Sequence, residues 1–179
     1  MAVTRRVHVA SMVCSIVLMA CGGGLRRSAA FEQIRNAHDS DMQSVLLDVP
    51  VTLTAQEDAR GGTDTVRALV THGFLAAAGP ARGGDRVYRL TQKGEQAASG
   101  WTVEGRRHPA SGLVVTYRVA LAMKRVRAVT GVHVEGSQAT VEYTWCWEPT
   151  EVGTGAVDTG EQQATAAFRR FDDGWRLVE

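Results

Sequence analysis

Apolar and polar residues follow different periods in the two halves of the chain. Before about residue 100, apolar residues recur at helical spacing, most clearly at Val66, Leu69, Val70 and Phe74. From Val103 onward the period becomes two, which is typical of strands with one buried face. The pattern therefore predicts short helices in the first half and an antiparallel sheet in the second.

Capping and turn residues divide the first half into short elements. Thr63 or Asp64 caps one helix and Thr91 caps another, because the side-chain oxygens of these residue types accept hydrogen bonds from free backbone amides. Gly79-Pro80 marks a turn between the two helices. The segment 42–54 is mixed, and its type stays open. The predicted elements are helices over 25–38 and 55–60, a helix that begins at Thr63 or Asp64, a strand over 86–90 and a helix from Thr91 through Ala98.

The second half predicts an antiparallel meander of about four strands. Alternation is loose over 113–123, and 126–134 either continues that strand or pairs with it. Glu135-Gly136 and Asp172-Asp173-Gly174 mark turns between strands. The strands expected around these turns cover 139–147, 164–171 and 175–178.

The start of the chain is a processing segment rather than part of the fold. Arg5 and Arg6 precede an apolar run from Val7 to Ala20 that carries no charge. The run is too short to span a bilayer, which needs about 20 apolar residues. These features are typical of a bacterial signal peptide.

The end of that run, Leu18-Met19-Ala20-Cys21, resembles the lipobox of bacterial lipoproteins, a family defined by its processing. The resemblance implies cleavage after Ala20 and lipidation of the Cys21 sulfur. In a bacterium with two membranes, Gly22 rather than Asp after the cysteine also implies the outer membrane, on the periplasmic side, rather than the inner membrane; the sequence does not say whether the source has two membranes. Two alternatives stay open: an ordinary secreted protein cleaved after Gly22, and a cytoplasmic protein with an apolar first helix.

Composition adds an argument about partners. Cleavage after residue 20 would leave 159 of the 179 residues, enough for one domain with a proper core or for two small domains packed together. Without Arg5 and Arg6 the chain carries 18 basic and 19 acidic side chains, a net charge of −1. This balance gives no electrostatic reason to bind nucleic acid.

Cys146 is then the one cysteine that is neither removed nor lipidated, so no internal disulfide is expected.

A second resemblance concerns the first half of the chain. The segments 66–75 and 87–94 look like the helix and wing of winged-helix regulators, a shape that is poorly specific for function. The matching helix offers Arg67 and His72, and the wing carries Arg82, Arg86 and Arg89. A lipid-anchored domain outside the cytoplasm would meet no genome, so we expect this shape to serve another use.

Together the patterns predict an α+β fold in which a winged-helix-like helical half packs on a C-terminal antiparallel sheet. The expected organisation is a signal peptide over 1–20, a lipidated cysteine and flexible tether over 21–27, the helical half over 28–100 and the sheet over 101–179.

An aromatic row provides the candidate partner-binding residues. Val141, Tyr143, Trp145 and Trp147 share one face of a strand, because side chains alternate. One interpretation is a core stripe that packs the sheet on the helical half. The other is a binding face for a partner protein, peptidoglycan or another glycan. Trp147, near the strand end and beside a loop, is the best candidate.

The sequence gives little support for a catalytic site or a metal site. A nucleophilic Cys146 would need a positioned histidine base, and the spacing of His38, His72, His108 and His133 brings none near it. The acidic loop 148–161 lacks the spacing of a calcium site. No metal site, cofactor site or phosphate-binding loop is predicted.

These observations predict a non-enzymatic envelope lipoprotein. It would be held at the membrane through Cys21 and would present a protein- or glycan-binding surface, without a cofactor and without nucleic acid as partner. The first alternative is a cytoplasmic winged-helix DNA-binding regulator. A weaker alternative is an envelope hydrolase that uses Cys146.

Overall fold

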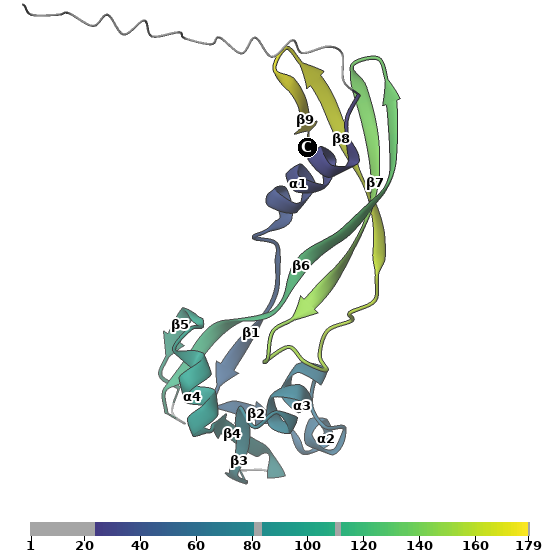
Figure 1. Cartoon of the computed structure of the whole chain (residues 1–179). Helices are drawn as coiled ribbons and strands as arrows, with labels where there is room; N and C mark the ends of the chain where they lie inside the picture. The colour runs from purple at the N-terminus through teal and green to yellow at the C-terminus, as the bar shows by residue number, and fades with distance from the viewer. Residues whose placement is uncertain (1–23, 81–83, 110–111, 179) are drawn as a thin grey trace, which may run out of the picture.

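The protein is elongated, with two lobes joined by a narrow waist (Figure 1). The structure, a computed structural model, describes residues 24–80, 84–109 and 112–178. Cys21 and the predicted signal peptide lie outside these residues. The elements are α1 (Arg27–His38), β1 (Met42–Val49), β2 (Val51–Leu53), α2 (Ala55–Ala59), α3 (Asp64–Thr71), β3 (Leu75–Pro80), β4 (Arg86–Leu90), α4 (Gln92–Ala98), β5 (Thr102–Arg107), β6 (Val114–Glu135), β7 (Gln138–Pro149), β8 (Gln162–Phe171) and β9 (Gly174–Val178).

The predicted fold class is wrong. Strands hold 51% of the described residues and helices 22%, and the large antiparallel sheet is curled like half a barrel. No helical half exists in the described chain, because α2, α3 and α4 contain only five, eight and seven residues. The helical spacing from Val66 to Phe74 reflects one short helix. The segment that the sequence left open, 42–54, forms strands β1 and β2.

One strand runs through both lobes. β6 is 22 residues long, so 126–134 continues the strand before it. Its first half pairs with β1 and β5, and its second half pairs with β7. The large sheet has the order β1-β6-β7-β8-β9, with β5 also paired to β6. We call α1, β7, β8, β9 and the second half of β6 the upper lobe, as drawn in Figure 1.

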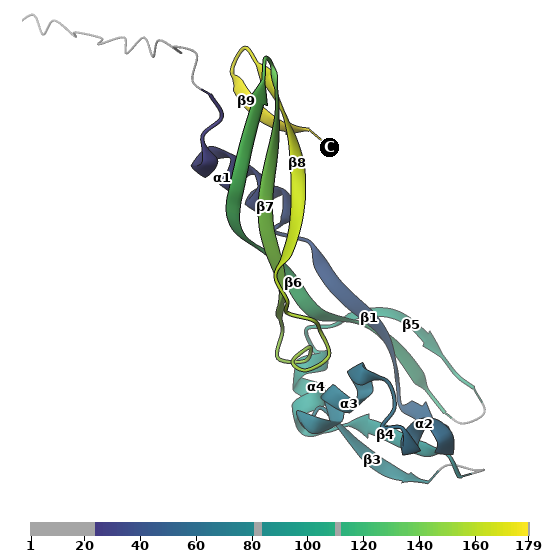
Figure 2. The ribbon, with the colours of Figure 1, turned by 90° about the vertical axis from the view of Figure 1, so that its right-hand side faces the viewer.

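In the upper lobe, α1 lies across the sheet (Figures 1 and 2). Ala30 and Ile34 of α1 are fully buried, and they pack with Val141 of β7 and Phe168 of β8. Leu25, two residues before the first residue of α1, is buried in the same cluster. The start of the described chain is therefore held in the upper core.

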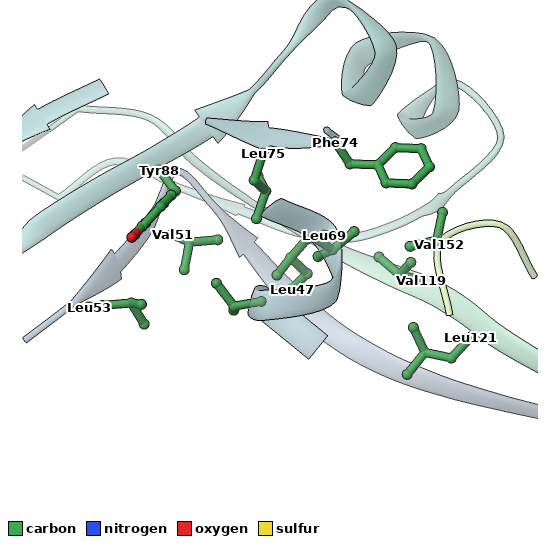
Figure 3. Packing of buried hydrophobic residues seen from close by; sticks show 11 residues of the cluster. Leu47, Val51, Leu53, Leu69, Phe74, Leu75, Tyr88, Val119, Leu121 and Val152 are labelled. Carbon is green, nitrogen blue, oxygen red and sulfur yellow. The ribbon is translucent and has the colours of Figure 1, made fainter. Parts of the chain in front are cut away.

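The lower lobe consists of β1 to β5, α2 to α4, the first half of β6 and the connection 150–161. A small sheet of order β2-β4-β3 supports α3, and the side chains of Leu47, Leu69, Phe74 and Val119 meet there (Figure 3). The helices are capped as their sequences predict: the Thr63 and Thr91 side chains accept hydrogen bonds from backbone amides three residues later. Short elements are thereby fixed around one core.

The connection between β7 and β8 is packed into the lower lobe. Thr150 donates from its backbone amide and its hydroxyl to the carbonyl oxygen of Leu121, at 2.8 and 3.1 Å. Val152 is buried in the lower core, and Glu151 forms an ion pair with Lys93. This acidic segment therefore joins the end of the upper sheet to the lower lobe.

Candidate binding surface

The aromatic row of β7 runs from the upper core to the waist. Val141 and Tyr143 are buried, with 0% and 4% of their surface exposed, and they pack with α1. Trp145 is half-buried at the edge of the same cluster, and Trp147 is half-buried beyond it. The row thus packs against α1 rather than against the helix and hairpin of residues 64–90. Its outer end is where side-chain surface remains accessible.

Trp145 and Trp147 form an edge-to-face pair at the waist. Their ring centroids are 5.3 Å apart, with an interplanar angle of 89°. The ammonium group of Lys124 lies 4.7 Å from the centroid of Trp145. Lys124 of β6 is opposite Trp147 in the strand register, and only 13% of its side chain is exposed. The cation–π contact therefore holds Trp145 from one side.

A polar chain borders this aromatic pair. His38 at the end of α1 lies 2.7 Å from Asp41 through Nδ1 and 3.2 Å from the Tyr143 hydroxyl through Nε2. Lys124 Nζ lies 3.3 Å from the same His38 Nδ1, so the histidine links Asp41, Lys124 and Tyr143. Lys124 Nζ is 3.6 Å from Asp41 Oδ2. The pKa of Tyr143 is raised by burial and, second, by the negative charge of Asp41.

The opposite face of β7 carries Cys146, with 6% of its surface exposed. Arg127 donates from Nε to its sulfur at 3.0 Å, and this hydrogen bond is the largest cause of a raised pKa of Arg127. No hydrogen bond joins a histidine to Cys146 in the part of the chain that the structure describes. Arginine does not act as a base in proteins, so the described hydrogen bonds supply no general base for the thiol.

Thr144 and Glu148 lie on the same face as Cys146, and they differ in their hydrogen bonding. Thr144 is 6% exposed, and its hydroxyl oxygen has no hydrogen-bond partner among the described residues. Glu148 accepts from Arg125 at 2.6 Å, and this hydrogen bond lowers the pKa of the Glu148 carboxyl. Arg125 also lies 3.7 Å from Asp39 at the end of α1. The charged groups on this face thus tie α1, β6 and β7 together at the waist.

The other histidines are placed apart from this surface. His72 ends α3, and His133 near the tip of β6 lies 3.7 Å from Glu142. Within the described ranges, no group of three or more His, Cys, Asp or Glu side chains could hold a metal ion. Nor does any described helix combine the length and apolar character needed to cross a membrane.

Sequence reasoning missed three members of the surface: His38, Asp41 and Lys124. His38 and Asp41 lie more than 100 residues from Tyr143 in sequence, and only the packing of α1 on the sheet brings them to it. Lys124 left a weak signal, because it is a cation inside a strand whose register places it opposite an aromatic residue.

Comparison of the chain with protein families, with curated proteins and with solved structures found no match.

Proposed function

We propose that the chain is a bacterial envelope lipoprotein, lipidated on Cys21, that binds a protein or glycan partner without catalysing a reaction. It would be anchored in the outer membrane and face the periplasm. The observation that carries the binding role is the half-buried Trp145–Trp147 pair beside Lys124. The anchor rests on the lipobox Leu18-Met19-Ala20-Cys21.

The position of Leu25 relates the anchor to the fold. Cys21 precedes the buried Leu25 by four residues. Four residues span at most about 14 Å when fully extended. A lipid on Cys21 would hold the upper lobe at the membrane surface, and two or three acyl chains on one residue would keep it there durably. The waist and the lower lobe would then extend into the space beyond.

The aromatic pair has the properties of a binding centre. Tryptophan supplies a large apolar face at small conformational cost and is enriched among residues that dominate binding energies. Both rings are oriented by contacts within the protein, Trp145 by Lys124 and each ring by the other. Sugars and apolar side chains both pack on such rings, while His38 and Asp41 provide polar groups nearby.

The binding test compares the half-buried Trp147 at the waist with an exposed aromatic residue at the far hairpin. The lipidated full chain is incubated with purified peptidoglycan and, separately, with detergent-solubilised envelope proteins under crosslinking. Trp147→Ala should lower capture at least tenfold in one arm. Phe171→Ala, a matched control at the far hairpin with 43% exposure, should leave capture unchanged. Equal capture by both variants would contradict a binding role for the waist.

The anchor has its own test. Cys21→Ser should abolish incorporation of a labelled fatty acid and leave an unprocessed precursor in the cell. Equal label in the variant and the natural sequence would contradict lipidation of Cys21. This result is independent of partner capture by Trp147.

A further inference from the structure

The upper end of the molecule, away from the waist, brings three segments together. The start of the described chain, the turn between β6 and β7 and the turn between β8 and β9 all lie there (Figures 1 and 2). The two turns are joined, because the backbone amide of Arg170 donates to the Ser137 carbonyl at 2.8 Å. Leu25 is buried in the same cluster as Phe168, near the end of β8. We call residues 24–27, 134–137 and 169–176 the hairpin end.

The hairpin end carries an excess of positive charge. Arg176 is neutralised by an ion pair with Asp173. The acidic residues that remain are Glu135 and Asp172, both exposed. Four exposed arginines form no ion pair with a residue that the structure describes, and these are Arg26, Arg27, Arg169 and Arg170. Since the chain from residue 21 onward is nearly neutral as a whole, this excess is local.

Exposed apolar side chains lie among these charges. Phe171 is 43% exposed and Val134 is 44% exposed. The guanidinium carbon of Arg176 lies 5.5 Å from the centroid of the Phe171 ring, and this contact orients the ring. Arg169 is directly opposite Arg176 in the register of β8 and β9, a position in which like charges repel. Asp173 offsets only one of these two charges, so an external anion would stabilise the pair.

The proposed lipid anchor indicates what covers this end. Cys21 precedes the buried Leu25 by four residues, which span at most about 14 Å. The headgroup layer on each side of a bilayer is about 6 Å deep, and charges interact across about 8 Å at physiological salt. A lipid on Cys21 would therefore keep Leu25, and the arginines that follow it, within reach of charged headgroups.

We propose that the hairpin end binds the surface of a membrane that contains anionic phospholipids, with its arginines on headgroup phosphates and Phe171 in the interfacial layer. Arginine suits this ligand because its planar guanidinium donates two parallel hydrogen bonds to phosphate. Apolar rings beside such cations bury their surface at the boundary between headgroups and acyl chains. The inference rests on the proposed lipidation of Cys21, and it adds an orientation in which the waist is directed away from the bilayer.

The test places a fluorescent amino acid with a naphthyl side chain at position 171 of the lipidated full chain. Position 70 on α3 is the control, because Val70 is a 39% exposed apolar residue in the lower lobe. The chain is reconstituted into vesicles of phosphatidylcholine and phosphatidylglycerol whose acyl chains are brominated near the headgroup, since bromine quenches a nearby fluorophore. Quenching should be at least fivefold stronger at position 171 than at position 70. It should fall at least twofold at position 171 when phosphatidylglycerol is omitted.

Charge-reversal variants separate the arginines from the anchor. Arg169→Glu combined with Arg170→Glu should reduce quenching at position 171 at least threefold. Co-sedimentation of the lipidated chain with the vesicles should stay complete, because the acyl chains are unchanged. Arg60→Glu combined with Arg89→Glu makes the same change of charge at two exposed positions of the lower lobe and should leave the quenching unchanged.

Three results would overturn the proposal while the anchor stands, each with a chain that co-sediments with the vesicles. They are equal quenching at positions 171 and 70, equal quenching at position 171 with and without phosphatidylglycerol, and no effect of the Arg169 and Arg170 variant at an unchanged melting temperature. A chain that fails to co-sediment would contradict the anchor and this orientation together. Partner capture through Trp147 is measured without a bilayer, so it is independent of these results.

Discussion

The upper lobe buries its core between a 12-residue helix and long strands, whereas the elements that belong to the lower lobe alone contain three to eight residues. In the upper lobe, side chains make the contact: Ile34 of α1 packs with Val141 and Phe168 of the sheet. In the lower lobe, backbones approach closely. A Cβ atom on Gly94 would lie 2.1 Å from the Phe74 carbonyl oxygen, and one on Gly153 would lie 1.8 Å from that of Leu121.

This difference explains which parts of the fold a sequence can reveal. Side-chain packing on a helix or strand leaves a periodic pattern of apolar residues. Close backbone contact leaves only a glycine, and glycine also occurs in turns and flexible loops. The lower lobe therefore depends on contacts that periodicity does not record. The following substitutions test whether the two lobes are stabilised in these two ways.

Phe168→Ala should have the largest effect, because Phe168 is 1% exposed at the centre of the upper core. Truncating a buried phenylalanine costs about 3–5 kcal/mol of unfolding free energy. Phe171→Ala, three residues along β8 and 43% exposed, should cost less than about 1 kcal/mol. Urea unfolding of both variants measures the difference. Similar losses would show that the upper lobe does not depend on this side-chain core.

Gly153→Ala should have the second-largest effect on stability. The added Cβ collides with the carbonyl oxygen of Leu121, which also accepts hydrogen bonds from the Thr150 amide and hydroxyl. Overpacking of this kind costs about 1–3 kcal/mol. Gly105→Ala is the matched control, since nothing lies within 4 Å of the position of its Cβ. The melting temperature should fall for Gly153→Ala and stay unchanged for Gly105→Ala. If both glycines tolerate alanine, close backbone contact does not stabilise the lower lobe.

The smallest effect should come from pH, and each lobe contains one tyrosine with a raised pKa, Tyr143 in the upper lobe and Tyr88 in the lower lobe. The pKa of Tyr143 is raised chiefly by burial, and that of Tyr88 chiefly by its hydrogen bond to Asp58. Below pH 10 both rings are neutral in the folded and unfolded states. Above it the unfolded chain ionises first, so stability falls as pH rises from 10 through the raised folded pKa values.

Tyr143→Phe and Tyr88→Phe should each reduce this alkaline loss. Melting temperatures between pH 8 and pH 11.5 would show a flatter decline for each variant than for the natural chain. A natural chain whose stability does not change over this range would contradict both raised pKa values.

Much of the local structure could be predicted from sequence, and the architecture could not. Apolar periodicity and capping threonines place α1, α3 and α4, and alternation with turn residues places β7, β8 and β9. The fold class was wrong because short helices were counted as a helical half, while the mixed segment 42–54 and the residues after Phe74 form strands. Pairing between β1 and β6 joins residues about 70 positions apart, which local patterns do not record.

The candidate surface was predicted in part. Alternation identifies the shared face of Tyr143, Trp145 and Trp147, and the structure buries the first while leaving the other two half-buried. The polar neighbours His38 and Asp41 come from the end of α1, and their approach follows from tertiary packing. Whether this surface binds a partner stays a prediction.

Photocrosslinking in intact cells tests the central claim most directly. A photoreactive phenylalanine analogue is placed at position 147 in the full lipidated chain, and at position 171 as control. We expect a discrete crosslinked species from position 147, none from position 171, and loss of that species when Trp145→Ala is added. The absence of any crosslink from position 147, or the same species from both positions, would contradict the assignment of the waist as the binding surface.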